Sequence, residues 1–286
     1  MFAIAVGLLL YLFVRDRHGL AAAWAAVAVY AGSGLVFGYL TLVRDVRALS
    51  TLLVFGAYVL AEDVRWLGAG VLVGLAVDTR LLLLAVVPVF LLYARRRPAF
   101  AAGLGAALVP TLVFLVISPS AFWFDNVRYH SLKSSSGLVV DAHQKAQTAA
   151  TLLGLESSDR ALGIQFALLV LAAAIAVVWR RHLPLALAIA VALGIVSFLP
   201  TPSYVQYFSL LVPFLVVGAL ELRPGLPVLA LFVAAFLVPA AWTVSHLVSY
   251  DPVLRPSLGS VRDDLGARRL GCETRRARVS APGPAT

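Results

Sequence analysis

Acidic and basic side chains lie together in short segments between long apolar runs, and they are the residues whose types could do chemistry. Arg44, Asp45 and Arg47 stand at the end of one run, and Asp78 and Arg80 stand between two others. A carboxylate can accept a proton as a general base, and a guanidinium binds phosphate through paired hydrogen bonds. The two clusters predict a cavity lid suited to a phosphate and a polar substrate. The alternative is that each Asp only neutralises its Arg neighbours.

A third polar cluster follows three aromatic residues in the segment 118–130, which reads SPSAFWFDNVRYH. It contains Asp125, Arg128, Tyr129 and His130. The aromatic side chains suit a water–lipid interface. Arg128 and His130 are then predicted to bind an anionic headgroup, while the aromatic rings lie against a sugar or lipid. The alternative is an interfacial turn closed by a salt bridge between Asp125 and Arg128.

A fourth set, Tyr204, Gln206 and Tyr207, follows a turn with prolines at 200 and 202. Two prolines stiffen the turn, and the hydroxyl and amide groups could face a lipid phosphate. An aromatic belt on a tight turn is the alternative. Cys272 is the only cysteine, and His130 and His143 lack the spacing of metal ligands. The sequence therefore predicts no cofactor and no metal, although it leaves a divalent cation open.

Apolar helices must position these residues. Hydrophobic residues make up 61% of the 286-residue chain, charged residues 13%, and the mean hydropathy is +0.93. A soluble domain has about 45–50% apolar and about 25% charged residues, so this composition excludes a soluble enzyme, a disordered chain and a disulfide scaffold. The net charge of +9 comes from basic residues in short turns. Nucleic-acid binding is not expected, because it requires basic residues gathered on one soluble face.

The apolar runs predict an all-α fold, a polytopic transmembrane helix bundle of about 8–10 passes in a cell membrane, typical of a bacterial plasma membrane. We expect a transmembrane domain over 1–250 with one long exoplasmic loop at about 118–160, and a basic, disordered tail over 251–286. The short runs 67–77 and 81–94 read as two short helices around a polar cavity. They could instead form one long tilted helix with a snorkelling Arg80. The runs are 1–14, 19–40, 46–61, 67–77, 81–94, 99–117, 161–179, 184–199, 207–222 and 227–249.

The polar turns between these runs form two alternating sets. Compact arginine clusters at 15–18, 62–65, 95–98, 180–182 and 223–224 predict the cytoplasmic side. The other set, at 44–47, 78–80, 118–160 and 200–204, is then exoplasmic and carries the candidate site residues. The basic tail breaks this pattern. The alternation of the turns places it on the exoplasmic side, whereas its arginines would favour the cytoplasmic side.

The chain resembles the GT-C superfamily of polyprenyl-phosphate-dependent membrane glycosyltransferases. It is most similar to family 39 and its relatives, the protein mannosyltransferases and the lipid A aminoarabinose transferases. Three stretches carry the resemblance: 70–80 (GVLVGLAVDTR), 118–130, and 200–208 (PTPSYVQYF). The first is similar to the family pattern G-x-x-x-G-L-A-x-x-T-[KR], in which Thr79 and Arg80 match the last pair. Asp45 matches the second acidic position of the family.

The resemblance implies transfer of a sugar from a polyprenyl-phosphate donor in the membrane lipid to an exoplasmic acceptor. A carboxylate is expected to act as base, and basic residues are expected to stabilise the leaving phosphate. In the family the main catalytic acid lies in a first exoplasmic loop, which this sequence lacks, so we expect a chain truncated at its N-terminus and without transfer activity. Asp45 then supplies a secondary acidic contact.

Two further interpretations stay open on the sequence alone. One is a transporter or a protein that binds lipid-linked sugars. Transporters often show inverted repeats and polar residues at the midplane, whereas this chain shows no repeat and gathers its polar residues at one face. The other is a nonfunctional fragment of a transferase, which would carry the same motifs.

Overall fold

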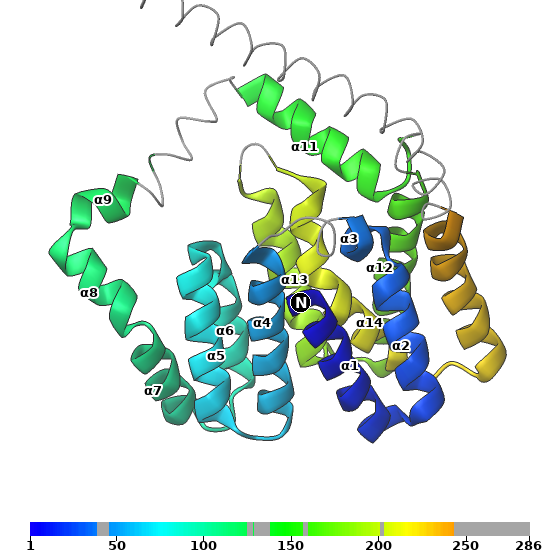
Figure 1. Cartoon of the computed structure of the whole chain (residues 1–286), viewed down its shortest axis with the longest axis horizontal. Helices are drawn as coiled ribbons and strands as arrows, with labels where there is room; N and C mark the ends of the chain where they lie inside the picture. The colour runs from blue at the N-terminus through cyan, green and yellow to red at the C-terminus, as the bar shows by residue number, and fades with distance from the viewer. Residues whose placement is uncertain (39–45, 125–127, 129–137, 157–159, 201–202, 243–286) are drawn as a thin grey trace, which may run out of the picture. The chain divides into compact units, whose positions relative to one another are not determined.

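The computed structural model describes residues 1–38, 46–124, 128, 138–156, 160–200 and 203–242. Every regular element within these ranges is a helix, which confirms the all-α prediction (Figure 1). One compact unit covers Met1–Ala240. The predicted tail at 251–286 lies outside the described residues and stays a prediction.

The first helices form a packed group at the N-terminus. Helices α1 (Phe2–His18) and α2 (Leu20–Gly32) form a hairpin whose turn is Gly19, where φ is +87°. Glycine suits that left-handed backbone because it has no Cβ. A short helix α3 (Gly34–Val36) follows, and α4 (Val46–Glu62) packs against α1.

Helix α5 (Trp66–Thr79) is followed by η2 (Leu81–Ala85), α6 (Val86–Tyr93) and α7 (Arg97–Ala107). A Cβ on Gly70 would overlap the carbonyl of Phe100, and one on Gly103 would overlap the carbonyl of Leu67. Gly70 and Gly74 are four residues apart on α5, and glycines at this spacing let two helices approach closely. Residues 67–74 run along 100–107 in the same direction. Because α5 and α7 are parallel, α6 must return between them, so the runs 67–77 and 81–94 are two short helices and not one tilted helix.

The chain then bends by 49° between α7 and α8 (Val109–Ile117), and α8 has no buried residue. Within the predicted loop 118–160 lie two helices, α9 (Pro119–Trp123) and α11 (Leu138–Leu152). The remaining helices are α12 (Arg160–Arg180), α13 (Leu185–Phe198), η4 (Val205–Leu211), α14 (Val212–Leu220) and the helix Leu226–Trp242.

The core of the unit lies around α14, in which every residue is buried. Phe214 of α14 packs edge-on against Phe55 and Tyr58 of α4, with ring centres 5.5 and 6.0 Å away. Phe13 of α1 lies 5.2 Å from Tyr58 in the same cluster. Aromatic pairs in this geometry add about 0.5–1.5 kcal/mol beyond their burial. The cluster therefore fixes α1, α4 and α14 against one another.

By length and composition, α12 could cross a membrane, and the bent pair α7–α8 would be a second span if it acts as one. The other apolar helices that meet the composition test within the described ranges have 10–17 residues. A straight span needs about 20 residues. The prediction of 8–10 passes is therefore neither confirmed nor excluded by the helix lengths and stays a prediction.

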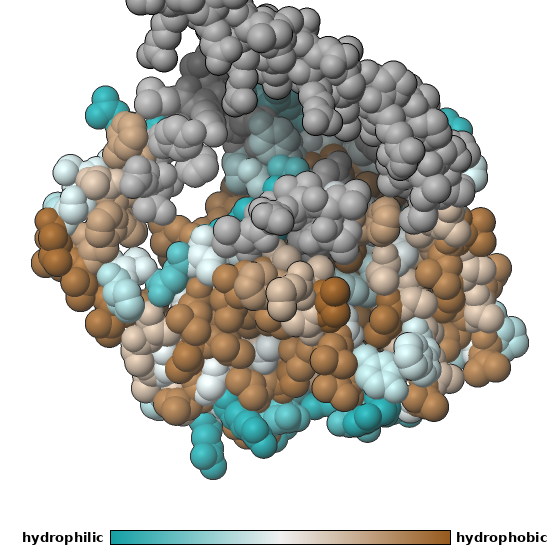
Figure 2. All heavy atoms as spheres, viewed as in Figure 1, coloured by the Kyte–Doolittle hydropathy of each residue, from teal (hydrophilic) through white to brown (hydrophobic). Residues whose placement is uncertain are grey.

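Large apolar side chains are exposed along the outer helices. Val116 of α8 is 80% exposed, and Val178 and Trp179 of α12 are each 77% exposed. In Figure 2, hydrophobic residues cover the middle of the viewed face, and hydrophilic residues form a strip along its lower edge. Soluble monomers rarely expose contiguous apolar surface on this scale.

Candidate functional site

Three helix ends that are distant in sequence bring Arg47, Arg80 and Tyr207 together. Arg47 lies in the first turn of α4, Arg80 directly follows α5, and Tyr207 lies in η4. Each guanidinium carbon is 5.9 Å from the centre of the Tyr207 ring. The two cations therefore lie at most twice that distance apart. We call these three residues the arginine–tyrosine cluster.

Hydroxyl groups fix the backbone beneath this cluster. The Thr79 hydroxyl donates to the carbonyl of Ala76 at 2.6 Å and lies 2.8 Å from the Ser50 hydroxyl. Because the single proton of Thr79 is used in the first bond, Ser50 is the donor in the second. Ser50 is fully buried, so this bond ties α4 to α5 where Arg47 and Arg80 emerge.

The electrostatics of the cluster favour an anion. Arg47 is only 8% exposed, and moving a cation out of water costs several kcal/mol. A cation–π contact to the Tyr207 ring returns about 0.5–2 kcal/mol of that cost. The second guanidinium, on Arg80, adds repulsion between like charges. A phosphate that accepts hydrogen bonds from both side chains would reverse that repulsion.

A cavity of about 380 Å³ adjoins the cluster, because Arg80 lines it as well. Asp78 stands on its wall and accepts a hydrogen bond from the Thr111 hydroxyl of α8. The aromatic rings of Phe114 and Phe122 form the opposite side, with centres 6.3 Å apart. The cavity thus combines a cation, a carboxylate and aromatic surface, which are the groups that bind sugars and phosphates.

No protein-family model, curated protein or solved structure matches the chain. The similarity to GT-C glycosyltransferases therefore rests on the three sequence stretches alone and stays a prediction.

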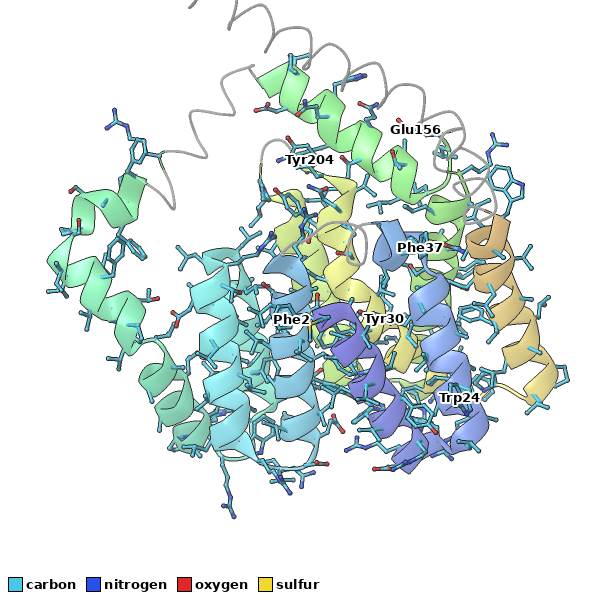
Figure 3. The ribbon with its side chains drawn as sticks, viewed as in Figure 1. Phe2, Trp24, Tyr30, Phe37, Glu156 and Tyr204 are labelled. Carbon is cyan, nitrogen blue, oxygen red and sulfur yellow. The ribbon has the colours of Figure 1, made fainter. Side chains whose placement is uncertain are left out.

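A smaller cavity of about 230 Å³ lies between α11 and the turn that carries Tyr204 (Figure 3). The Thr148 hydroxyl of α11 donates to the carbonyl of Ser203 at 3.0 Å. The Ser203 hydroxyl is buried without a hydrogen-bond partner among the described residues. The rings of Tyr204 and Tyr207 are 5.8 Å apart, so a residue that lines this cavity contacts the arginine–tyrosine cluster.

The structure places only some of the predicted site residues together. Arg47, Arg80 and Tyr207 form the cluster, and Tyr204 and Asp78 line the cavities beside it. Gln206 lies in η4, and its carbonyl accepts a hydrogen bond from Ser209 at 2.8 Å. Arg128 is exposed and does not line either cavity. The predicted residues Arg44, Asp45, Asp125, Tyr129 and His130 lie outside the described residues.

Gln165 is a positioning residue that sequence reasoning missed. It is 3% exposed, and its Oε1 accepts from the N–H of Gly34 at 2.9 Å. Its Nε2 donates to the carbonyls of Gly32 and Phe236 at 3.3 and 3.2 Å. One amide thus holds the break between α2 and α3 against α12 and the helix Leu226–Trp242. An amide inside the apolar run 161–179 is the signal that could have revealed it, because polar groups there are costly.

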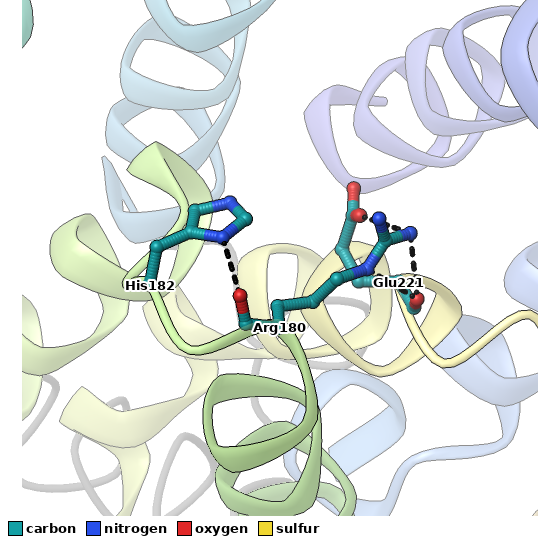
Figure 4. Close-up of polar contacts among 3 residues, drawn as sticks. All are labelled: Arg180, His182 and Glu221. Atoms are coloured by element: carbon teal, nitrogen blue, oxygen red, sulfur yellow. Dashed lines mark hydrogen bonds and ion pairs between the residues drawn. The ribbon is translucent and has the colours of Figure 1, made fainter.

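Arginines at the opposite helix ends are paired with acids. Arg180 contacts the Glu221 carboxylate at 3.2 Å and donates to the Glu221 carbonyl at 3.0 Å (Figure 4). Arg17 contacts Glu62 at 2.5 Å and Asp63 at 3.5 Å. These acids neutralise the two arginines. Among the described residues, no three His, Cys, Asp or Glu side chains are placed to hold a metal ion.

Proposed function

We propose that the chain is an integral, multi-pass protein of a cell membrane, and that this is a bacterial plasma membrane. The exposed apolar side chains of α8 and α12 support a lipid environment. The close glycine contacts between α5 and α7 are the packing that membrane helices use. Polar clusters at the two opposite sets of helix ends suit the two membrane surfaces.

Short helices in such a membrane would recess the arginine–tyrosine cluster. Helix α5 has 14 residues, so it rises about 21 Å. The hydrocarbon core is about 30 Å thick. If α5 begins at the arginine-rich membrane surface, Asp78 and Arg80 lie several ångströms below the opposite membrane surface. Polar residues at that depth are tolerated where they line a wet cavity, which fits the cavity beside them.

We infer that the site binds the phosphate of a polyprenyl-phosphate-linked sugar, and that the chain is a GT-C type glycosyltransferase. The observation that carries the inference is the placement of Arg47 and Arg80 at 5.9 Å from the same ring, that of Tyr207. Two guanidinium groups suit an anion with several acceptor oxygens. The adjoining cavity, with Asp78 and two aromatic rings, suits the sugar.

The proposed reaction is an inverting displacement at the anomeric carbon. The acceptor hydroxyl oxygen forms a bond to that carbon, while the bond from the carbon to the donor phosphate breaks. The hydroxyl proton passes to a carboxylate, which in the family belongs to the first exoplasmic loop, and Asp45 supplies a secondary acidic contact. The phosphate leaves with the electron pair, and Arg47 and Arg80 stabilise the negative charge that develops on it.

Binding of undecaprenyl phosphate to the full chain in nanodiscs tests this proposal. Arg80→Gln should weaken binding about tenfold or more, because it removes charge-assisted hydrogen bonds. Arg95→Gln, an exposed arginine at the other helix ends, is the control and should bind normally. Because Arg47 is buried, Arg47→Gln is interpreted only if its unfolding temperature is unchanged. Normal binding by Arg80→Gln would remove the arginine–tyrosine cluster from the site.

An assay of sugar transfer distinguishes an enzyme from a binding protein. The full chain is offered polyprenyl-phosphate mannose and polyprenyl-phosphate aminoarabinose in liposomes, and release of undecaprenyl phosphate is measured. Release that depends on Arg80 supports a transferase. Binding without release from either donor supports the alternative, a protein that binds or moves lipid-linked sugars.

A further inference from the structure

Two cavities at the arginine-rich helix ends share three of their lining residues. The first has about 290 Å³ and is lined by Arg17, His18 and Arg223 together with apolar residues. The second has about 250 Å³ and is a groove whose lining residues are all apolar, from α2, α12, α14 and the helix Leu226–Trp242. Both are lined by Leu220, Pro224 and Leu229, so the basic cavity adjoins the apolar groove.

The charges around the basic cavity are uneven. Arg17 is paired with Glu62 and Asp63, and Arg180 is paired with Glu221 nearby. Arg223 is exposed, and its guanidinium has no ion pair within the described part of the chain. The cavity therefore presents one cation whose charge is not already neutralised, beside an imidazole that can donate a hydrogen bond.

The backbone at Arg223 is held in a conformation that favours glycine. Its φ is +48°, and its N–H donates to the carbonyl of Leu220 at 2.9 Å as α14 ends. Glycine is the usual residue at this left-handed position after a helix. Proline at 224 then stops the helix. An arginine that keeps this strained position at the mouth of a cavity is a signal of function.

We propose that these adjoining cavities bind one anionic phospholipid, with its phosphate against Arg223 and His18 and an acyl chain in the apolar groove. The proposal rests on the membrane location inferred above but not on glycosyl transfer. A head-and-tail molecule fits, because one end of the site is cationic and the other end offers only apolar walls. The membrane leaflet that faces compact arginine clusters is also the one rich in anionic lipids.

The experiment measures lipid binding to the full chain by native mass spectrometry in detergent. Dioleoyl phosphatidylglycerol is compared with dioleoyl phosphatidylcholine, which has the same chains and no net charge. We expect phosphatidylglycerol to bind at least about fivefold tighter, because its net charge attracts Arg223, whereas the choline cation of phosphatidylcholine repels it. Equal binding of the two lipids would overturn the proposal.

Matched variants test each half of the site. Arg223→Gln should abolish the preference for phosphatidylglycerol. Arg181→Gln should keep it, although Arg181 also has a positive φ, of +54°, and lies at the same helix ends. Ala172→Phe fills the groove and should weaken the binding of both lipids. Ala174→Phe, on the same helix but outside the groove, should leave their binding unchanged.

Inorganic phosphate distinguishes a lipid from a free anion. If millimolar phosphate displaces the lipid and Ala172→Phe has no effect, the cavity binds a free anion and the lipid proposal fails. The proposed transferase fails separately. Arg80→Gln should leave phosphatidylglycerol binding unchanged, and Arg223→Gln should leave undecaprenyl phosphate binding unchanged.

Discussion

The two sets of helix ends use arginine in different ways. At one end, Arg17 and Arg180 lie within 3.2 Å of glutamates on neighbouring turns. At the other end, Arg47 and Arg80 both face the ring of Tyr207. The paired arginines hold turns together, whereas the two arginines around one ring are those that we propose for phosphate binding. The arrangement of neighbours, and not the number of arginines, separates structure from binding.

The largest expected effect comes from separating α7 from α5, the helix that Arg80 follows. In Gly70→Val the new side chain must displace the Phe100 carbonyl, and overpacking of this kind costs about 1–3 kcal/mol. Undecaprenyl phosphate binding should be lost along with stability. Gly105→Val is the control, because a Cβ there meets nothing within 4 Å. Equal unfolding temperatures for the two variants would contradict the close packing.

Removing the amide of Gln165 should have the next largest effect. Gln165→Leu leaves the N–H of Gly34 and the carbonyl of Gly32 without their partner. Each buried group without a partner costs about 1–3 kcal/mol. A lower unfolding temperature, measured in detergent, is the expected result. Gln147→Leu, at an exposed side chain of α11, serves as control, and an equal loss in both variants would argue against the role of Gln165.

Ion pairs at the arginine-rich end should matter less. Glu62→Gln removes the partner of Arg17, whose side chain is 34% exposed. Exposed ion pairs contribute about 0.2–1 kcal/mol. The unfolding temperature should fall slightly, and undecaprenyl phosphate binding should stay normal. A large loss of that binding would show that the two ends are not independent.

The smallest effect is a pH dependence at His18, the last residue of α1. Burial lowers the pKa of His18 below its ordinary 6.5; Glu221 raises it, and Arg223, Arg17 and Arg180 lower it further. The folded state favours the neutral ring, so its contribution to stability is full above pH 6.5 and is lost as the pH falls through the folded pKa. His18→Gln should make the unfolding temperature depend less on pH between pH 5 and 8. An unchanged slope would assign the pH dependence to other groups.

Much of the fold follows from local sequence. The apolar runs predicted helices, and the described elements are helices. The close packing of α5 against α7 at Gly70 and Gly74 was not predicted from the sequence and came from the structure. The paired short runs around Arg80 were left undecided, because apolar pattern alone cannot tell a hairpin from one tilted helix. The contacts of α7 decided it.

The sequence by itself determined that arginines and tyrosines stand in polar turns between apolar helices, because residue type and hydropathy are local properties. Only the tertiary structure decided that Arg47 and Arg80 share Tyr207, that Arg128 does not line the neighbouring cavities, and that Gln165 joins three helices. These contacts join residues far apart in the chain. They depend on which helix faces meet, and that is set by side-chain packing over the whole unit and not by any one segment.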